Sequence, residues 1–110
     1  MEVYELYPTF REKVNEDPTE AARWVDSLTI EAATMLAYSI TLEANAMLEE
    51  IRVRATFKKG SNERIRSSER ILEVKEDLRK IQQLLSSLGN DVHPGIFTGT
   101  IRMLERASFR

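Results

Sequence analysis

Two long stretches of helical apolar spacing, separated by a short segment around Gly60, constrain the fold of this chain more than any other feature of its sequence. In the second stretch, apolar residues follow one another at steps of three and four, which is the spacing of a seam along one side of a helix. The seam consists of Ile71, Val74, Leu78, Ile81, Leu85 and Leu88. A single seam predicts one long helix with one principal neighbour.

The first stretch, over residues 30–51, is apolar on several sides, which predicts a central helix packed on several neighbours. We expect it to continue through Phe57 and to end near Gly60, where a residue without Cβ adopts the left-handed cap at little cost. Ser61 or Asn62 then caps the next helix. Because only about three residues separate the two helices, they are predicted to form an antiparallel hairpin. The residues expected at its buried middle are Ile40, Ala44, Met47, Leu78, Ile81 and Leu85.

Shorter helices are expected on either side of the hairpin. Thr9 and Glu12 have the spacing of a capping box, which predicts a short helix over residues 10–15. Asp17 followed by Pro18 is a stronger start signal, and it predicts a second helix that ends in a bend at residues 27–29. After a loop, a last helix is expected to turn three apolar residues inward, namely Phe97, Ile101 and Leu104.

No segment has the alternating pattern of a strand, so the chain is predicted to be all-α. The expected architecture is a compact bundle of four to five helices with a central antiparallel helical hairpin, forming one domain over residues 1–110. The longest uncharged run, residues 32–42, is too short to span a membrane. The first residues lack the basic start and apolar run of a secretion signal, so we expect a complete cytoplasmic protein.

The formal net charge of −2 hides a strong asymmetry between the two halves of the chain. Residues 1–50 contain three Lys/Arg and eleven Asp/Glu, whereas residues 51–110 contain thirteen and seven. The surplus of positive charge is greatest around the turn of the predicted hairpin. We call this segment, residues 52–70, the basic elbow. The predicted nucleic-acid-binding residues are its seven cations, Arg52, Arg54, Lys58, Lys59, Arg64, Arg66 and Arg70.

The basic elbow predicts an anionic partner, since long cationic side chains reach phosphates and release counterions. No helix-turn-helix, RRM or KH signature accompanies these cations, so the contact is expected to be independent of base sequence. The alternative is that the acidic first half neutralises the basic second half, within one bundle or across a dimer.

Catalytic chemistry receives little support from the sequence. There is no Cys, and the single histidine, His93, precedes Pro94 and is expected to be an extended loop residue. Carboxylates on the two arms suggest a site for Mg²⁺ as in all-α nucleotide pyrophosphohydrolases, but the Glu-x-x-Glu and Glu-x-x-Asp patterns of that family are absent. We expect ion pairs instead of a metal centre, with no catalytic residue, no metal and no cofactor. The carboxylates concerned are Glu49, Glu50, Glu73, Glu76 and Asp77.

Aromatic residues near the N-terminus are the predicted protein interface, because aromatic side chains are enriched at protein contacts. They are Tyr4, Tyr7 and Phe10, and the alternative is that these residues pack the short N-terminal helix against the bundle. The sequence therefore predicts a non-catalytic small helical subunit of a larger assembly, with other protein subunits and RNA or DNA backbone as partners and no membrane contact. The alternatives are a Mg-dependent all-α nucleotide pyrophosphohydrolase and a protein-binding regulator or inhibitor without nucleic-acid contact.

Overall fold

The computed structural model describes residues 2–108, apart from the side chains of Val3, Asn90 and Ser108, and in that range it contains five α-helices and no strand. The helices are α1 (Leu6–Glu16), α2 (Pro18–Ser27), α3 (Ile30–Arg54), α4 (Asn62–Leu88) and α5 (Thr98–Ser108), with short 3-10 turns η1 (Val3–Glu5) and η2 (Gly89–Asp91). The predicted all-α bundle is confirmed. Residues 1, 109 and 110 of the expected domain lie outside the described range.

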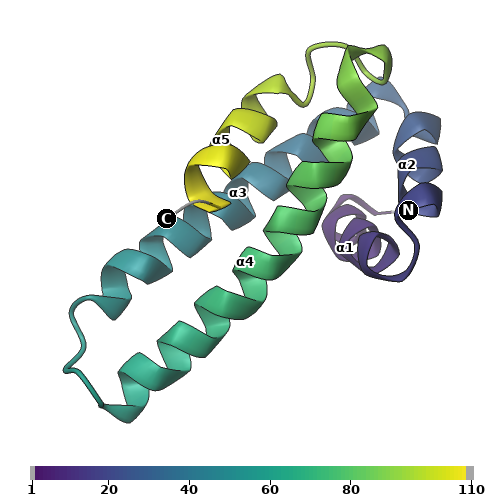
Figure 1. Ribbon diagram of the computed structural model, residues 1–110. Helices are drawn as coiled ribbons and strands as arrows, with labels where there is room; N and C mark the ends of the chain where they lie inside the picture. Colours follow the sequence, from purple (N-terminus) through teal and green to yellow (C-terminus); the bar gives the residue numbers. More distant parts are fainter. Residues whose placement is uncertain (1, 109–110) are drawn as a thin grey trace.

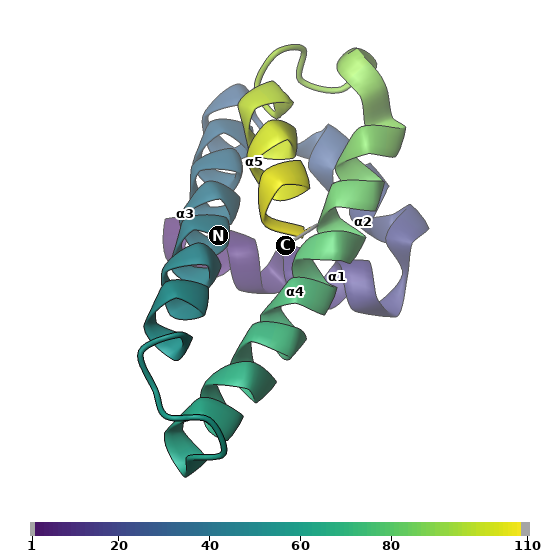
Figure 2. The same cartoon turned by 60° about the vertical axis from the view of Figure 1, so that its left-hand side comes forward.

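The long helices α3 and α4 run antiparallel and form the two arms of an elongated molecule that measures 46 × 23 × 23 Å (Figure 1). At one end of the arms, α5 packs against both α3 and α4, and α1 packs against both from the opposite face (Figure 2). Helix α2 packs mainly on α1. At the other end only the two arms remain, and the basic elbow joins them.

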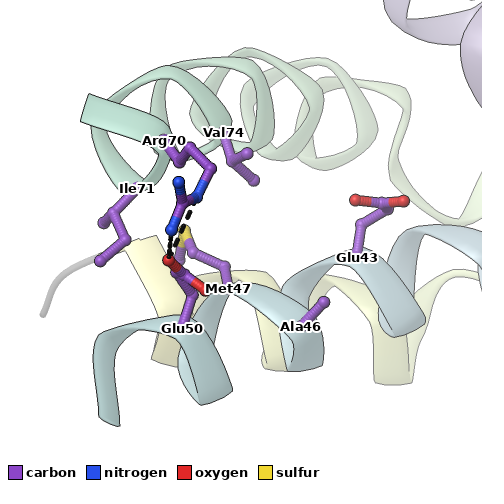
Figure 3. A pocket seen from close by; sticks show the side chains of 7 residues that line it. All are labelled: Glu43, Ala46, Met47, Glu50, Arg70, Ile71 and Val74. Carbon is purple, nitrogen blue, oxygen red and sulfur yellow. Dashed lines mark hydrogen bonds and ion pairs between the residues drawn. The ribbon is translucent and has the colours of Figure 1, made fainter. Parts of the chain in front are cut away.

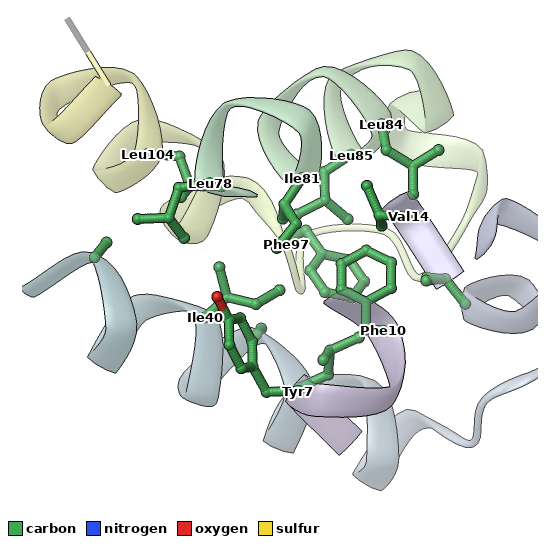
Figure 4. Packing of buried hydrophobic residues seen from close by; sticks show 14 of the residues in the cluster. Tyr7, Phe10, Val14, Ile40, Leu78, Ile81, Leu84, Leu85, Phe97 and Leu104 are labelled. Carbon is green, nitrogen blue, oxygen red and sulfur yellow. The ribbon is translucent and has the colours of Figure 1, made fainter. Parts of the chain in front are cut away.

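The core lies where α1, α3, α4 and α5 converge (Figure 4). Phe10 of α1 is fully buried there and stacks on Trp24 of α2, with 5.9 Å between the ring centroids. The prediction for the middle of the hairpin is confirmed, since all six expected residues are buried. Other large, fully buried side chains come from α2, α3 and α5, namely Val25, Leu36 and Leu104.

The predicted helix starts at Asp17 and Ser61 are confirmed. The carboxylate of Asp17 accepts hydrogen bonds from the amides of Thr19 and Glu20, with Pro18 in the first helical position. The expected bend lies between Ser27, where α2 ends, and Thr29, whose hydroxyl caps α3. The Ser61 hydroxyl accepts a 3.2 Å hydrogen bond from the Arg64 amide at the start of α4.

The predicted start of the first helix is wrong. Helix α1 begins at Leu6, and Thr9 lies inside it and does not cap it. Leu6 and Tyr7 are buried on the same face as Phe10, and this packing extends the helix toward the N-terminus. Pro8 is compatible with this start because it lies in the first turn, where amide groups have no partner within the helix.

The expectation of several neighbours is confirmed for α3, which packs on α1, α4 and α5, whereas the expectation of one principal neighbour is wrong for α4. Helix α3 is covered on one side only, through Ala33, Ala37 and Ala44, whose small side chains permit close packing. Its opposite side exposes Tyr38 and Leu42, with 59% and 50% of their surface accessible. Helix α4 has more than one principal neighbour, since it packs on α1, α3 and α5.

His93 lies in the loop before α5 and is not extended as expected, because its φ angle is 47°. Its Nε2 lies 2.8 Å from the carbonyl oxygen of Val25, to which it donates a hydrogen bond, and its ring meets the edge of Phe97. This contact holds the loop against the C-terminal end of α2. A structural role explains the left-handed conformation of a residue that precedes proline.

Candidate nucleic-acid interface

The loop of the basic elbow is longer than predicted, because α3 ends at Arg54 and does not reach Gly60. The Thr56 hydroxyl and the Thr56 amide both donate to the carbonyl oxygen of Val53, at 2.6 and 2.9 Å, and so close the last turn of the helix. Gly60 has a φ of +81°, a conformation that favours glycine. Residues 55–61 therefore form a turned loop at the tip of the hairpin.

Two arginines of the basic elbow stabilise its shape. Arg64 donates from Nη1 to the carbonyl oxygen of Phe57, at 3.1 Å, and thereby ties the loop to α4. Arg54 donates from Nη1 to the Ser68 hydroxyl, at 3.3 Å, across the two arms, while its buried Nε has no hydrogen-bond partner. Both side chains are only partly exposed, so they are poorly placed to meet a ligand in solvent.

Two further arginines are engaged in ion pairs. Arg70 reaches from α4 to Glu50 on α3, with its Nη2 and Nε at 2.6 and 3.2 Å from Oε1 (Figure 3). The buried hydroxyl of Ser67 donates to the same oxygen at 2.7 Å. These hydrogen bonds, from Ser67 first and then Arg70, hold the pKa of Glu50 below its ordinary value of 4.5. Arg52 forms a 3.4 Å pair with Glu49 on the exposed surface of α3.

The remaining three cations of the basic elbow are Lys58, Lys59 and Arg66, which we call the tip cations. All three are exposed, two in the loop and one in the second turn of α4. Among the described residues, none of them has an ion-pair or hydrogen-bond partner. Phe57 beside them is half-buried. The structure thus divides the seven predicted binding residues into four that have a hydrogen-bond or ion-pair partner within the chain, of which Arg52 and Arg70 are still exposed, and three that have none.

By sequence alone Ser67 is one of the neutral donors suited to backbone phosphates, but this is wrong, because Ser67 is the only buried residue of the basic elbow. Its position carries a signal, because Ser67 lies four residues before Ile71 and so continues the seam of α4 toward the elbow. Because the seam was defined by apolar residues alone, it was taken to begin at Ile71, one step after Ser67. A polar residue at a seam position indicates a hydrogen bond between the arms, and Glu50 accepts it.

The acidic residues of the two arms are dispersed in the structure. Glu76 pairs with Arg79 at 3.9 Å, and Asp77 accepts a 3.3 Å hydrogen bond from Asn15 of α1. Lys80 donates to the same asparagine side chain, at 2.9 Å. Within residues 2–108, no three acidic or histidine side chains are grouped so that they could hold a metal ion.

The predicted protein interface is largely part of the core, which corrects that prediction for two of its three residues. Phe10 is fully buried and Tyr7 is 9% exposed, so neither offers a surface to another protein. Burial raises the pKa of Tyr7, and the charge of Glu43 raises it further. Tyr4 is 76% exposed and remains a predicted contact residue.

No helix in the described part of the chain combines the length and apolar character needed to cross a membrane. No protein-family model, curated protein or solved structure matches this chain.

Proposed function

We propose that this protein is a non-catalytic helical binding subunit whose tip cations, Lys58, Lys59 and Arg66, contact nucleic-acid backbone independently of base sequence. The observation that carries the proposal is their exposure without internal partners at the tip of the hairpin, where other side chains fix the shape of the loop. A preformed loop loses little conformational freedom when it binds. The same proposal includes association with other protein subunits in the cytoplasm.

Contacts within the chain limit how many cations of the basic elbow can bind phosphates, and therefore limit the expected affinity. Arg54, Arg64 and Arg70 would have to give up hydrogen bonds to reach a phosphate, whereas the tip cations lose none. Three phosphate contacts correspond to a slope of log affinity against log salt of about −2 to −3. We therefore expect weak, strongly salt-dependent binding, which other subunits of an assembly would reinforce.

The alternative of a Mg-dependent nucleotide hydrolase receives less support from the same geometry. Such an enzyme needs several carboxylate oxygens directed at one point. Here Glu50 is turned toward Ser67 and Arg70, and Asp77 toward Asn15. Each of these two carboxylates thus has a donor of its own, and the two are not directed at a common point.

Binding can be measured by fluorescence anisotropy with labelled single-stranded and duplex RNA and DNA, each in two unrelated sequences, over a salt series up to about 0.15 M. A triple variant, Lys58→Gln, Lys59→Gln and Arg66→Gln, removes the tip cations without touching a hydrogen bond of the loop. We expect it to weaken binding equally for all sequences and to reduce the steepness of the salt dependence by about 2 to 3.

The matched control removes three exposed cations outside the basic elbow, through Arg23→Gln, Arg79→Gln and Arg102→Gln. It changes the net charge by the same amount and should leave the salt slope intact. An unchanged slope in the tip variant, with unfolding curves like those of the wild type, would refute the proposal. So would binding of the wild type to polyglutamate with no binding to any nucleic acid.

A further inference from the structure

A pocket of about 180 Å³ opens between α3 and α4, on the bundle side of the ion pair that joins the two arms (Figure 3). Its apolar lining consists of Ala46 and Met47 from α3, and of Ile71 and Val74 from α4. Ala46 is exposed, so the pocket is accessible from solvent. An apolar cavity of about 150 Å³ in another protein takes up benzene, so this pocket has room for a small organic molecule.

Three charged side chains also line the pocket, and only two of them are paired. Glu50 and Arg70 form one end, where they neutralise each other at 2.6 Å. Glu43 lies at the opposite end, separated from that pair by the apolar lining (Figure 3). Its half-buried carboxylate has no ion-pair or hydrogen-bond partner among the described residues. The pocket therefore carries one uncompensated negative charge.

The charge of Glu43 is not compensated from α1 either. Burial raises the pKa of Tyr7 on α1, the charge of Glu43 raises it further, and the charge of Arg11 lowers it. Glu43 and Arg11 thus both lie near Tyr7. Arg11, however, lies over the ring of Tyr7, 6.0 Å from its centroid, and it forms no ion pair with Glu43.

We propose that this pocket binds a small primary ammonium ion, with the ammonium group on Glu43 and an apolar body on Met47 and the apolar side chains of α4. An ammonium group supplies the positive charge and the N–H donors that the Glu43 carboxylate lacks. Met47 is unbranched and can adapt to the shape of the body. The ligand thus matches both the charge and the apolar lining of the pocket.

Other classes of ligand fit the pocket less well. An anion would meet its uncompensated negative charge. A Mg²⁺ or Ca²⁺ ion needs several oxygen ligands, whereas Glu43 offers the only carboxylate here without a partner. A neutral apolar molecule would remove water from Glu43 and give it no partner in exchange.

The spacing of the two ends sets the length of the ligand. Glu43 and Glu50 are seven residues apart on one helix, which corresponds to about 10 Å along its axis. An ammonium group on an extended chain of about five carbon atoms spans that distance and ends at the Glu50–Arg70 pair. Pentylammonium is therefore the probe of choice.

Titration of the ¹⁵N-labelled chain at neutral pH, followed by NMR, tests the proposal with three ligands of one length. They are pentylammonium, which stays protonated there as lysine does, the neutral pentan-1-ol, and the anion pentanoate. Pentylammonium should bind with millimolar affinity and shift the amide signals of the residues that line the pocket. Pentan-1-ol should bind at least about 10-fold more weakly, because it lacks the charge, and pentanoate should not bind.

Three variants connect this binding to the pocket. Glu43→Gln should weaken the binding of pentylammonium at least about 10-fold and leave that of pentan-1-ol unchanged. Glu105→Gln, on the exposed surface of α5, removes the same charge elsewhere and should change neither. Ala46→Leu fills the pocket from an exposed position and should abolish the binding of both ligands, with unfolding curves like those of the wild type.

Several outcomes would overturn the proposal. They are the absence of saturable binding of pentylammonium, equal affinities of the wild type for the ammonium ion and the alcohol, and an unchanged affinity in Glu43→Gln. Tighter binding of Nα-acetyl-lysine amide than of pentylammonium would also overturn it, since the pocket would then receive a lysine side chain of a partner protein and not a small molecule.

Discussion

At the end of the molecule where α1 and α5 join the two arms, side chains from four helices exclude water, whereas at the elbow end only α3 and α4 remain. Phe10, Ile40 and Leu104 have no exposed surface at the first end. At the second end, no side chain in residues 48–66 is buried. The hairpin thus changes along its length from a bundle of several helices to a bare pair of helices.

The two ends are consequently held by different interactions. Apolar burial, at about 25 cal/mol per Å², stabilises the bundle end. The elbow end relies on hydrogen bonds and ion pairs between the arms, chiefly those that Glu50 accepts from Ser67 and Arg70. Only some of the cations at this end are needed for that purpose. The tip cations remain in solvent because the pair of helices has no further surface against which to pack them.

The largest predicted effect contrasts the two ends directly. Ile81→Ala removes a fully buried side chain at the bundle end and should lower the free energy of unfolding by about 2 to 5 kcal/mol through lost burial and the cavity left behind. Ile65→Ala, at a 49% exposed position near the elbow, should cost less than about 0.5 kcal/mol. Denaturant titration measures both. A loss below about 1 kcal/mol for Ile81→Ala would contradict the assignment of the core.

A smaller effect is expected from the polar link between the arms. Ser67→Ala removes a buried hydroxyl that donates to Glu50 and should lower the free energy of unfolding by about 1 kcal/mol. Ser86→Ala, on the exposed surface of the same helix, controls for the higher helix propensity of alanine. If the two variants are equally stable, the Ser67 hydroxyl does not contribute to holding the elbow.

Periodicity predicted the bundle and its core because burial and helix geometry impose regular spacing on apolar residues. It did not predict that the opposite side of α3 stays exposed or that α1 and α5 also pack on α4, since an apolar pattern shows that a residue is apolar but not what lies against it. Tyr38 and Leu42 are apolar like Ile40 and widen the stripe to which it belongs, yet they face solvent. The packing of α1 and α5 makes that difference, and it depends on contacts distant in sequence.

The sequence predicted that positive charge is concentrated in the basic elbow, but it did not predict how the individual side chains are placed or which of them have partners. Composition identified all seven cations of the basic elbow, but it carries no information about internal hydrogen bonds. Arg64 and Lys59 are equivalent in a charge count, although the first binds the Phe57 carbonyl and the second has no partner among the described residues. Phe10 illustrates the same limit for interfaces, because an aromatic residue near a terminus fits a core and a partner equally well.

The smallest predicted effect concerns how stability at the elbow end depends on pH. The pKa of Glu50 is lowered in the folded protein, because the hydrogen bonds from Ser67 and Arg70 stabilise its charged carboxylate relative to the unfolded chain. This contribution is present above the ordinary pKa of 4.5 and is lost as the pH falls through the lower, folded-state pKa. Glu50→Gln should therefore be less stable than the wild type at neutral pH, and the difference should shrink under acid conditions. Urea unfolding at several pH values measures this, with Glu73→Gln on the exposed surface of α4 as a control of equal charge. A difference that stays constant as the pH falls would show that the carboxylate charge does not hold the arms together.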